Sequence, residues 1–205
     1  GSQQVQNIPG LSLNENGSYE LDLSDPAYQS LAEGQVQDYS VDYVVTDEYG
    51  ASATQTLTFT ITGTNDAPTI TASNVVGAIT EGVDLVDSGS ITFTDVDLTD
   101  SPEASNTEKS LEAFKADGTS LALTSGQRDL IMAGFSIQQD SLSTNNGMVN
   151  WAYAIPELHI DFLAVGERVT LLETITVADG KGGTVTQDVT VTITGTNDTP
   201  TITTV

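Results

Sequence analysis

Residues 61–70 read ITGTNDAPTI and residues 193–202 read ITGTNDTPTI, so one decapeptide occurs twice with a single substitution. The match continues without a gap from residues 46–60 and 178–192 back to residues 31–35 and 163–167, always at an offset of 132 residues. A period of this length is far above that of short solenoid repeats. The chain is therefore predicted to be a tandem array of whole domains.

The segment before each decapeptide alternates between apolar and polar residues. Residues 53–62 (ATQTLTFTIT) place Leu57, Phe59 and Ile61 on one face and threonines on the other, and residues 184–194 repeat the pattern. A period of two with β-branched residues is typical of a half-buried antiparallel strand. Preceding strands are expected at 37–45 and 169–177, and Asp- and Gly-rich turns separate them from the later ones. Two hairpins of one design are therefore predicted.

Glu173 interrupts the alternation of its strand, at the position where the first copy has Val41. A β-bulge or an edge position would explain an acid there, and so would a buried functional acid. The pattern favours a bulge or an edge position.

The second copy has a longer upstream segment, in which strands are expected at 89–94, 120–124, 134–139 and 147–155. Thr124 and Gln127 have capping-box spacing, so a short helix is predicted near 126–133. A further helical turn is expected around 107–116. An immunoglobulin-like sandwich takes about 100 residues, which the second copy can supply. The first is either a shorter variant or a domain without its first strands.

The predicted fold class is all-β, with tandem immunoglobulin- or cadherin-like antiparallel β-sandwiches. The predicted domains are residues 1–68 and 69–200, and residues 201–205 are expected to begin the next linker.

Composition excludes several functional classes. Twenty-nine acidic residues face five basic ones, giving a formal net charge of -24. Nucleic acid and anionic membrane surfaces are unsuitable partners because both require clustered Lys and Arg. No apolar run approaches the length of a membrane span, so direct membrane insertion is not expected. Zero cysteines exclude disulfides and thiol chemistry, and bound calcium would be an alternative stabiliser.

Catalysis is not expected. His159 is the only histidine and aligns with Ala27 of the other copy, which favours a packing or surface role over that of a general base. The sequence contains no Gly-x-Ser-x-Gly motif and no phosphate-cradling loop.

The decapeptide, the VTDEYG and VADGKGG turns and the LAEGQ and LAVGE segments together resemble the VCBS and cadherin-like repeats of giant bacterial RTX-type adhesins. Residues 78–100 and 120–137 are similar to the first half of such a repeat, so the resemblance covers most of 18–202. It implies extracellular sandwiches, exported by type I secretion, that extend an adhesin from the bacterial surface. It also implies calcium at the junctions between neighbouring repeats, which would be the partners of each unit. The glycine-rich nonapeptide repeats of the secretion region are absent.

Calcium prefers six to eight oxygen ligands, and the expected junction offers Asn65, Asp66, Glu81, Asp95 and Asp97. Asn and Asp also serve turns, through hydrogen bonds to nearby backbone amides. For Asn65 and Asp66 alone both interpretations stay open. Adding Glu81, Asp95 and Asp97 favours a metal site.

Seven weaker candidates complete the set. A solvated loop is the favoured interpretation of Asp100 and Glu103, and a tight turn that of Asp179. The turn with Asp47 and Glu48 is expected at the far end of its unit, which weakens both as ligands. The second linker is expected to bind calcium weakly or not at all; its residues are Asn197 and Asp198.

Two functions follow as hypotheses. The leading one is a calcium-stiffened extender of a cell-surface adhesin that serves adhesion or biofilm formation, acting as a monomer. The alternative is a module of the same adhesin that binds a peptide or sugar of a host or biofilm surface, with Trp151 and Tyr153 in its site. Trp151 aligns with Tyr19 on an alternating strand, which favours core packing.

Overall fold

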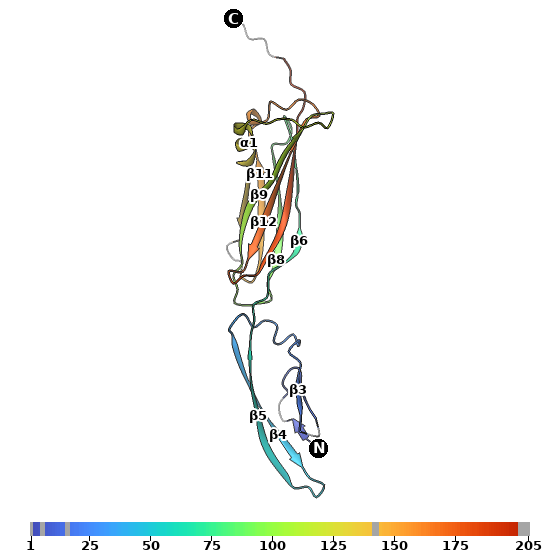
Figure 1. The fold of residues 1–205 in the computed structure, drawn as a ribbon, viewed down its shortest axis with the longest axis vertical. Helices are drawn as coiled ribbons and strands as arrows, with labels where there is room; N and C mark the ends of the chain where they lie inside the picture. Colours follow the sequence, from blue (N-terminus) through green and yellow to red (C-terminus); the bar gives the residue numbers. More distant parts are fainter. Residues whose placement is uncertain (1, 5–6, 15–16, 141–143, 201–205) are drawn as a thin grey trace. The chain divides into compact units, whose positions relative to one another are not determined.

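The structure is a computed structural model that describes residues 2–4, 7–14, 17–140 and 144–200 (Figure 1). Its contacts divide the chain into a first unit, Gly1–Asp66 with Val96–Asp100, and a second unit, Ala67–Asp95 with Ser101–Val205. The predicted domain boundaries stay predictions, and the expected linker at 201–205 lies outside the described residues.

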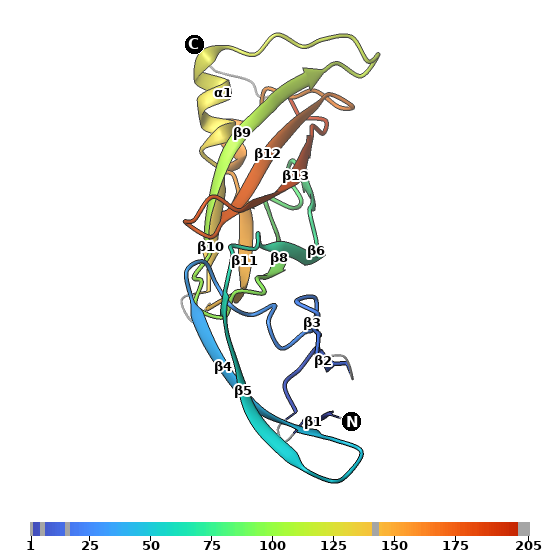
Figure 2. The same cartoon turned by 60° about the horizontal axis from the view of Figure 1, so that its bottom comes forward.

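The second unit is a sandwich of two four-stranded sheets (Figure 2). One sheet has the strand order β10-β11-β8-β6 and the other the order β7-β13-β12-β9. Neighbouring strands are antiparallel except β7 and β13, which run parallel. The bounds are β6 Thr69–Ser73, β7 Val76–Thr80, β8 Val86–Thr94, β9 Glu103–Phe114, β10 Phe135–Gln139, β11 Asn146–Ala154, β12 Arg168–Ala178 and β13 Thr184–Thr194.

The core of the second unit follows from the period of two. On β13 every second side chain points inward, and Val189, Val191 and Ile193 are fully buried. Trp151 and Tyr153 enter from β11 in the opposing sheet, and the Trp151 ring stacks on Phe135. The tryptophan and tyrosine thus belong to the core, as the sequence favoured.

One short α-helix, α1 (Ser125–Met132), begins at the predicted capping box. The Thr124 hydroxyl accepts a hydrogen bond from the backbone N–H of Gln127, and the Gln127 side chain accepts one from the N–H of Thr124. This reciprocal pair satisfies amides that a helix start leaves without intrahelical partners. A 3₁₀ turn, η1 (Glu157–His159), follows β11.

Two expectations for the second unit were wrong. Residues 107–116 are not helical, because they lie largely in β9 and pair with β12 along its length. Their Glu, Lys and Ala favour a helix, but sheet pairing and burial of Leu111 override that propensity. Residues 120–124 are not a strand: Ser120 makes one isolated bridge to Phe114, and Thr124 caps α1.

Glu173 combines features of both interpretations. The pairing of β12 with β9 shifts register between Leu172 and Glu173, where Lys109 of β9 is left without a partner in the register, so the irregularity of the ladder lies beside Glu173. The side chain is nevertheless buried, on an interior strand. Its Oε2 accepts a hydrogen bond of 3.0 Å from Nδ2 of Asn106. Burial raises the pKa of Glu173, the Asn106 bond opposes this, and the nearby Glu108 carboxylate raises it further.

The first unit has a three-stranded sheet of order β1-β4-β5 and a two-stranded sheet β2-β3. A small core forms where Ile8 and Leu11 pack on Val41. Strands β4 and β5 form the predicted hairpin, in continuous register from Val36↔Thr62 to Thr46↔Ser52. The bounds are β1 Ser2–Gln4, β2 Leu11–Leu13, β3 Tyr19–Leu21, β4 Val36–Thr46 and β5 Ser52–Thr62.

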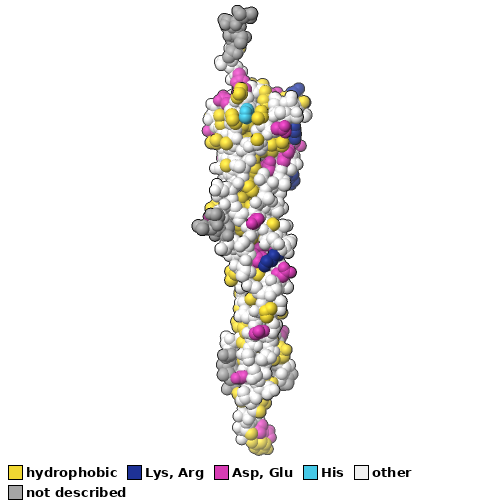
Figure 3. Space-filling model, turned by 90° about the vertical axis from the view of Figure 1, so that its left-hand side faces the viewer, with side chains coloured by type: hydrophobic (Ala, Val, Ile, Leu, Met, Phe, Trp, Pro, Cys, Tyr) yellow, Lys and Arg dark blue, Asp and Glu magenta, His cyan; other side chains and the backbone are white. Residues whose placement is uncertain are grey.

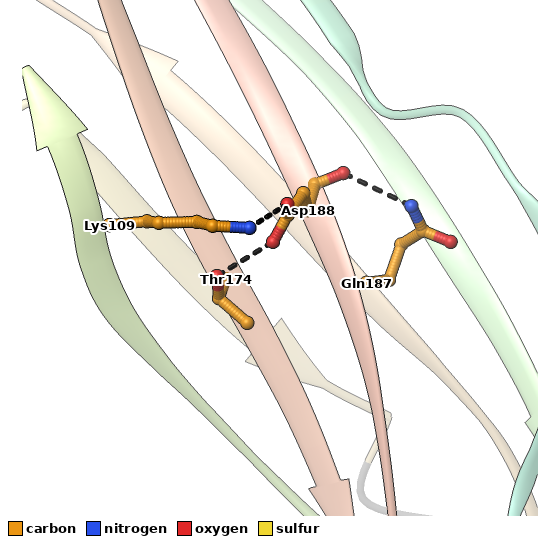
Figure 4. A network of polar contacts seen from close by, with 4 residues as sticks. All are labelled: Lys109, Thr174, Gln187 and Asp188. Carbon is orange, nitrogen blue, oxygen red and sulfur yellow. Dashed lines mark hydrogen bonds and ion pairs between the residues drawn. The ribbon is translucent and has the colours of Figure 1, made fainter.

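The outer face of the second unit is held by polar contacts between strands (Figure 4). Lys109 of β9 donates to Asp188 of β13 at 2.5 Å, and Thr174 of β12 donates to the same carboxylate at 2.7 Å. These hydrogen bonds, led by that of Lys109, lower the pKa of Asp188. The face drawn in Figure 3 carries far more acidic than basic side chains.

The predicted fold class is confirmed: the described residues are all-β, in mostly antiparallel sheets of the immunoglobulin and cadherin type, with one short α-helix. Among the helices of the described residues, none has the length and apolar character needed to cross a membrane.

Candidate calcium-binding residues

Three acidic side chains come together in the loop that follows β8. Asp95, Asp97 and Asp100 each offer a carboxylate oxygen, and these oxygens all lie within 4.8 Å of one another. All three residues are buried, with at most 4% of their surface exposed. The structure therefore brings together two predicted ligands and one that the sequence ranked as weak.

The backbone of this loop is held by Asn145, which precedes β11. The Asp95 N–H donates to the Asn145 carbonyl at 2.7 Å, and Nδ2 of Asn145 donates to the Asp95 carbonyl at 2.8 Å. Within the loop, the Asp100 N–H donates to the Asp97 carbonyl at 3.1 Å. Asn145 was not predicted, because a Thr-Asn-Asn-Gly stretch reads as an ordinary turn.

Three buried carboxylates at this separation oppose one another strongly if all are ionised. Each pair of unit charges about 5 Å apart repels by roughly 3 kcal/mol at an effective dielectric of 20. A divalent cation coordinated by the three would turn this repulsion into attraction. Carboxylate oxygens are also the ligands that calcium and magnesium prefer. The donor set therefore fits a hard divalent cation.

Asp66 contacts this loop through its backbone. Its N–H donates to Oδ2 of Asp97 at 2.9 Å, and both residues belong to the first unit. The Asn65 side chain is half-buried and that of Asp66 is exposed. The segment with Asn65 and Asp66 is therefore tied to the acidic loop, as the metal hypothesis requires.

The structure corrects the grouping of Glu81 with Asp95 and Asp97. Glu81 follows β7 at the end of the second unit where β13 finishes: its N–H donates to the Thr194 carbonyl, and its Oε2 accepts from the Thr196 N–H at 2.7 Å. Asp95 follows β8 at the opposite end, where Thr94 pairs with Thr69. The eleven residues of β13 span roughly 35 Å at about 3.3 Å per residue. One ion cannot bind both side chains.

Glu81 has a setting of its own. Its side chain is 1% exposed, and its Oε1 is buried without a hydrogen-bond partner among the described residues. Just after Thr196 come Asn197 and Asp198, both exposed. A carboxylate oxygen of Glu157 lies 3.6 Å from where a Cβ on Gly82 would stand. Glu81 thus belongs with the second linker, and Glu157, which sequence reasoning missed, lies close by.

The two predicted hairpin turns show why an Asp stands in each. Oδ1 of Asp47 accepts from the N–H groups of Tyr49 and Ala51, and Oδ1 of Asp179 accepts from those of Lys181 and Gly183. Both aspartates therefore hold a turn, as favoured for Asp179. Glu48 and Glu103 are exposed, the second at the start of β9.

The residues considered for ligand binding are buried in the core, and the histidine considered for catalysis lies in the 3₁₀ turn η1. Trp151 is fully buried and its Nε1 donates to the Asn74 carbonyl. The Tyr153 hydroxyl donates to the Ile131 carbonyl at 2.9 Å, and burial raises the pKa of that hydroxyl. His159 is half-buried in η1.

No protein-family profile matches the chain, and no curated protein matches it either. Solved structures similar to it include protocadherin gamma B2 extracellular cadherin domains 3–6, with 11% identity, 95% of this chain and 40% of that chain covered, and a TM-score of 0.42. Another is the sialic acid binding region of a Streptococcus sanguinis adhesin, which is 15% identical to this chain. The match covers 75% of this chain and 37% of that chain, with a TM-score of 0.36. The Ig1-2 module of the Drosophila receptor protein tyrosine phosphatase DLAR is 15% identical to this chain. The match covers 66% of this chain and 53% of that chain, with a TM-score of 0.34.

The chain thus spans about half or less of each of these structures. Because the TM-scores of these similar structures are all below 0.5, the function of the chain has to be argued from its own residues.

Proposed function

We propose that the chain is a pair of extender repeats from the stalk of a bacterial cell-surface adhesin, and that calcium stiffens the linkers between its repeats. The observation that carries the proposal is the buried group of Asp95, Asp97 and Asp100, whose oxygens converge within 4.8 Å. Export by type I secretion and a role in adhesion or biofilm formation follow from the resemblance of the repeated decapeptide.

The first calcium site would use the three aspartates, with the adjoining segment that contains Asn65 and Asp66. The hydrogen bond from the Asp66 N–H to Asp97 supports this assignment, because it fixes the linker segment against one of the three carboxylates. A bound cation would then restrict the backbone where the first unit ends.

A second site would use Glu81 with the linker that contains Asn197 and Asp198. Glu81 already accepts a hydrogen bond from the Thr196 N–H, and its other oxygen is buried. Each site pairs buried acid with an Asn-Asp linker, but the first offers three buried aspartates and the second one buried glutamate, so the second is the weaker site, as expected for the second linker.

The two residues that suggested the ligand-binding alternative do not support it. Trp151 and Tyr153 are both fully buried, so neither can contact a sugar or a peptide.

Calcium titration followed by thermal unfolding tests the proposal. For extracellular modules Kd is roughly 0.1–1 mM, so about 10 mM calcium should stabilise each site by roughly 1.4–2.7 kcal/mol. This corresponds to an increase in Tm of roughly 3–10 °C for a domain of this size. Magnesium should substitute poorly, because it prefers small octahedral sites and retains its water.

Variants assign the effect to residues. Replacing Asp95 and Asp97 by Asn should remove most of the increase, and Glu81→Gln should remove only the part that belongs to the second site. The matched control is D129N/D161N, which removes two exposed charges elsewhere and should leave the increase intact. Small-angle scattering with calcium and with chelator then measures linker stiffness. An unchanged Tm and unchanged maximum dimension would refute the proposal.

A further inference from the structure

Asn145 and Asp95 extend the ladder of β8 and β11 by one more pair of residues. The two strands are in register along their whole length, and Thr94 pairs with Asn146, so Asp95 and Asn145 are the next opposing residues. The Asp95 N–H donates to the Asn145 carbonyl at 2.7 Å, as in a regular ladder. The return bond to the Asp95 carbonyl, at 2.8 Å, comes from the side-chain amide of Asn145. A side chain therefore closes the ladder at the point where the acidic loop begins.

This side-chain hydrogen bond controls the direction in which the chain leaves β8. The Asp95 carbonyl belongs to the peptide group that joins Asp95 to Val96, and a peptide group is planar. Holding the carbonyl therefore orients the first peptide of the loop that contains Asp97 and Asp100, whose carboxylates converge with that of Asp95. The Asn145 side chain thus acts on the carboxylate positions through the backbone.

The Asn145 side chain is itself held in one orientation. Asn145 is 8% exposed, and the Thr144 hydroxyl donates to its Oδ1 at 3.3 Å, which leaves Nδ2 directed at the Asp95 carbonyl. An amide nitrogen is a hydrogen-bond donor and has no free electron pair for a cation, and Oδ1 already accepts from Thr144. Asn145 is therefore a positioning residue of the calcium site and not one of its ligands.

Through Asn145 the acidic loop is anchored to the rigid part of the second unit. Asn145 directly precedes β11, whose Val149, Trp151 and Tyr153 are fully buried in the core. Because protein cores are close-packed, β11 cannot shift without disturbing many contacts. The backbone that carries Asp95 is therefore bonded to a strand that stays in place.

We propose that Asn145 sets the calcium affinity of the first site by fixing the backbone of Asp95. The inference rests on the proposed function, because it concerns the first calcium site of that proposal. Without the side-chain amide, the peptide after Asp95 can rotate, and a cation must reorder the loop before three carboxylates can bind it. Calcium then binds more weakly. By reciprocity, bound calcium strengthens the hydrogen bond between Asn145 and Asp95.

The probe is calcium alone, titrated into the full chain labelled with ¹⁵N. Every chain carries Glu81→Gln, so that the second proposed site does not contribute, and Kd is read from the amide signals of Asp97 and Asp100. Loss of an outer partner lowers metal affinity by about 10- to 100-fold, so Asn145→Ala should raise Kd about tenfold or more. The matched control is Val149→Ala on β11, which removes buried methyl groups. It should lower the Tm in chelator and change Kd by less than about twofold.

The difference between affinity and stability decides the role of Asn145. If Asn145 only supports the fold, Asn145→Ala and Val149→Ala both lower the Tm in chelator while Kd stays that of the parent, and the inference is overturned although the calcium site stands. If the parent itself shows no calcium-dependent shift, the calcium site is refuted and the inference falls with it. The two failures are therefore distinguishable.

A measurement on the parent decides the matter if Asn145→Ala does not fold. Opening of the bond between Asn145 and Asp95 should release the ion, so hydrogen exchange of the Asn145 side-chain amide should slow when calcium is bound. With Kd of roughly 0.1–1 mM, about 10 mM calcium should slow it by about 10- to 100-fold. The exposed side-chain amide of Asn150, on the same strand, is the internal control and should exchange equally fast with calcium and with chelator. Equal exchange at Asn145 under both conditions overturns the inference.

Discussion

The two hairpins, β4–β5 and β12–β13, are the same structure in different surroundings. Their strands pair in equivalent register over eleven residues. On the outer face, Thr56 of β5 donates to Asp42 of β4, whereas Thr174 of β12 donates to Asp188 of β13. Positions 42 and 56 correspond to 174 and 188, so the Asp and the Thr have exchanged strands while the contact is kept. Each hairpin therefore makes this Asp–Thr contact between its own two strands, and in the second unit Lys109 of β9 adds a further contact to Asp188.

The inner faces of the two hairpins differ in burial, because burial of their side chains depends on an opposing sheet. On β13 Val189, Val191 and Ile193 are fully buried, but Leu57 and Phe59 of β5 are only half-buried. In place of an opposing sheet, the Phe59 ring stacks on Tyr39, which in turn meets Tyr28 edge to face. Burial, and with it hydrophobic stabilisation, is therefore unequally divided between two hairpins of the same register.

The largest expected effect compares Ile155→Ala with Leu23→Ala at equivalent positions. Ile155 is 3% exposed and Leu23 is 55% exposed. Removing a fully packed aliphatic side chain costs about 2–5 kcal/mol of unfolding free energy, and removing an exposed one costs less than about 1 kcal/mol. Urea unfolding monitored by Trp151 fluorescence for the second unit, and by circular dichroism for both, measures the difference. Equal losses would contradict the unequal burial.

A smaller effect is expected at the hairpin turns. A Cβ on Gly183 would lie 2.1 Å from Oδ2 of Asp179 and 2.8 Å from the Cα of Ala67, so Gly183→Ala must displace backbone. Such overpacking costs about 1–3 kcal/mol. The first unit already has Ala51 at this position, and Ala51→Gly should change stability by less than about 1 kcal/mol. Thermal melting of both variants tests this, and a tolerated Gly183→Ala would show that the turn and Ala67 can separate.

The smallest effect concerns Glu173, which occupies the place of Val41. Because burial raises its pKa in the folded state, the folded chain binds more protons than the unfolded chain between pH 4.5 and that raised pKa. The stability contributed by the protonated acid is complete below pH 4.5 and is lost as the pH rises through the folded pKa.

Glu173→Gln should therefore stabilise the chain at pH 7, by about 1 kcal/mol, the size typical of single substitutions, and should have no such advantage below pH 4.5. Denaturant unfolding of variant and parent at each pH gives the difference. The control is Glu112→Gln on β9, which removes an exposed carboxylate and should not reproduce the gain at pH 7. A pH-independent gain for Glu173→Gln would mean that packing, and not ionisation, is responsible.

Local sequence signals predicted what is local in the structure. The hairpins follow from alternation over eleven residues, and α1 follows from the Thr124 and Gln127 pair. The pairing of β7 with β13 joins residues more than 100 positions apart, and no local sequence pattern predicts it. For that reason the sequence assigns Glu81 and Asp95 to the same junction, although the fold places them at opposite ends of the second unit.

The acidic loop was predicted only in part. The spacing of Asp95 and Asp97 suggested ligands, but the burial of Asp100 depends on the loop's path, which Asn145 holds from the turn before β11. Strand β9 was missed because Lys109, Glu112 and Ala113 favour a helix in isolation. In both places tertiary contacts, which sequence periodicity does not contain, decide the outcome.

The parallel pairing of β7 with β13 also sets how the second unit would respond to mechanical tension. The chain enters this unit beside Gly183, near the start of β13, and leaves it after Thr194. Pulling the two ends apart draws β7 and β13 in opposite directions along their common axis. Their five residue pairs are then loaded together in shear and must break at once, not one by one. A stalk built from such units would resist stretching at the pairing of β7, the second strand of the unit, with β13, its last strand.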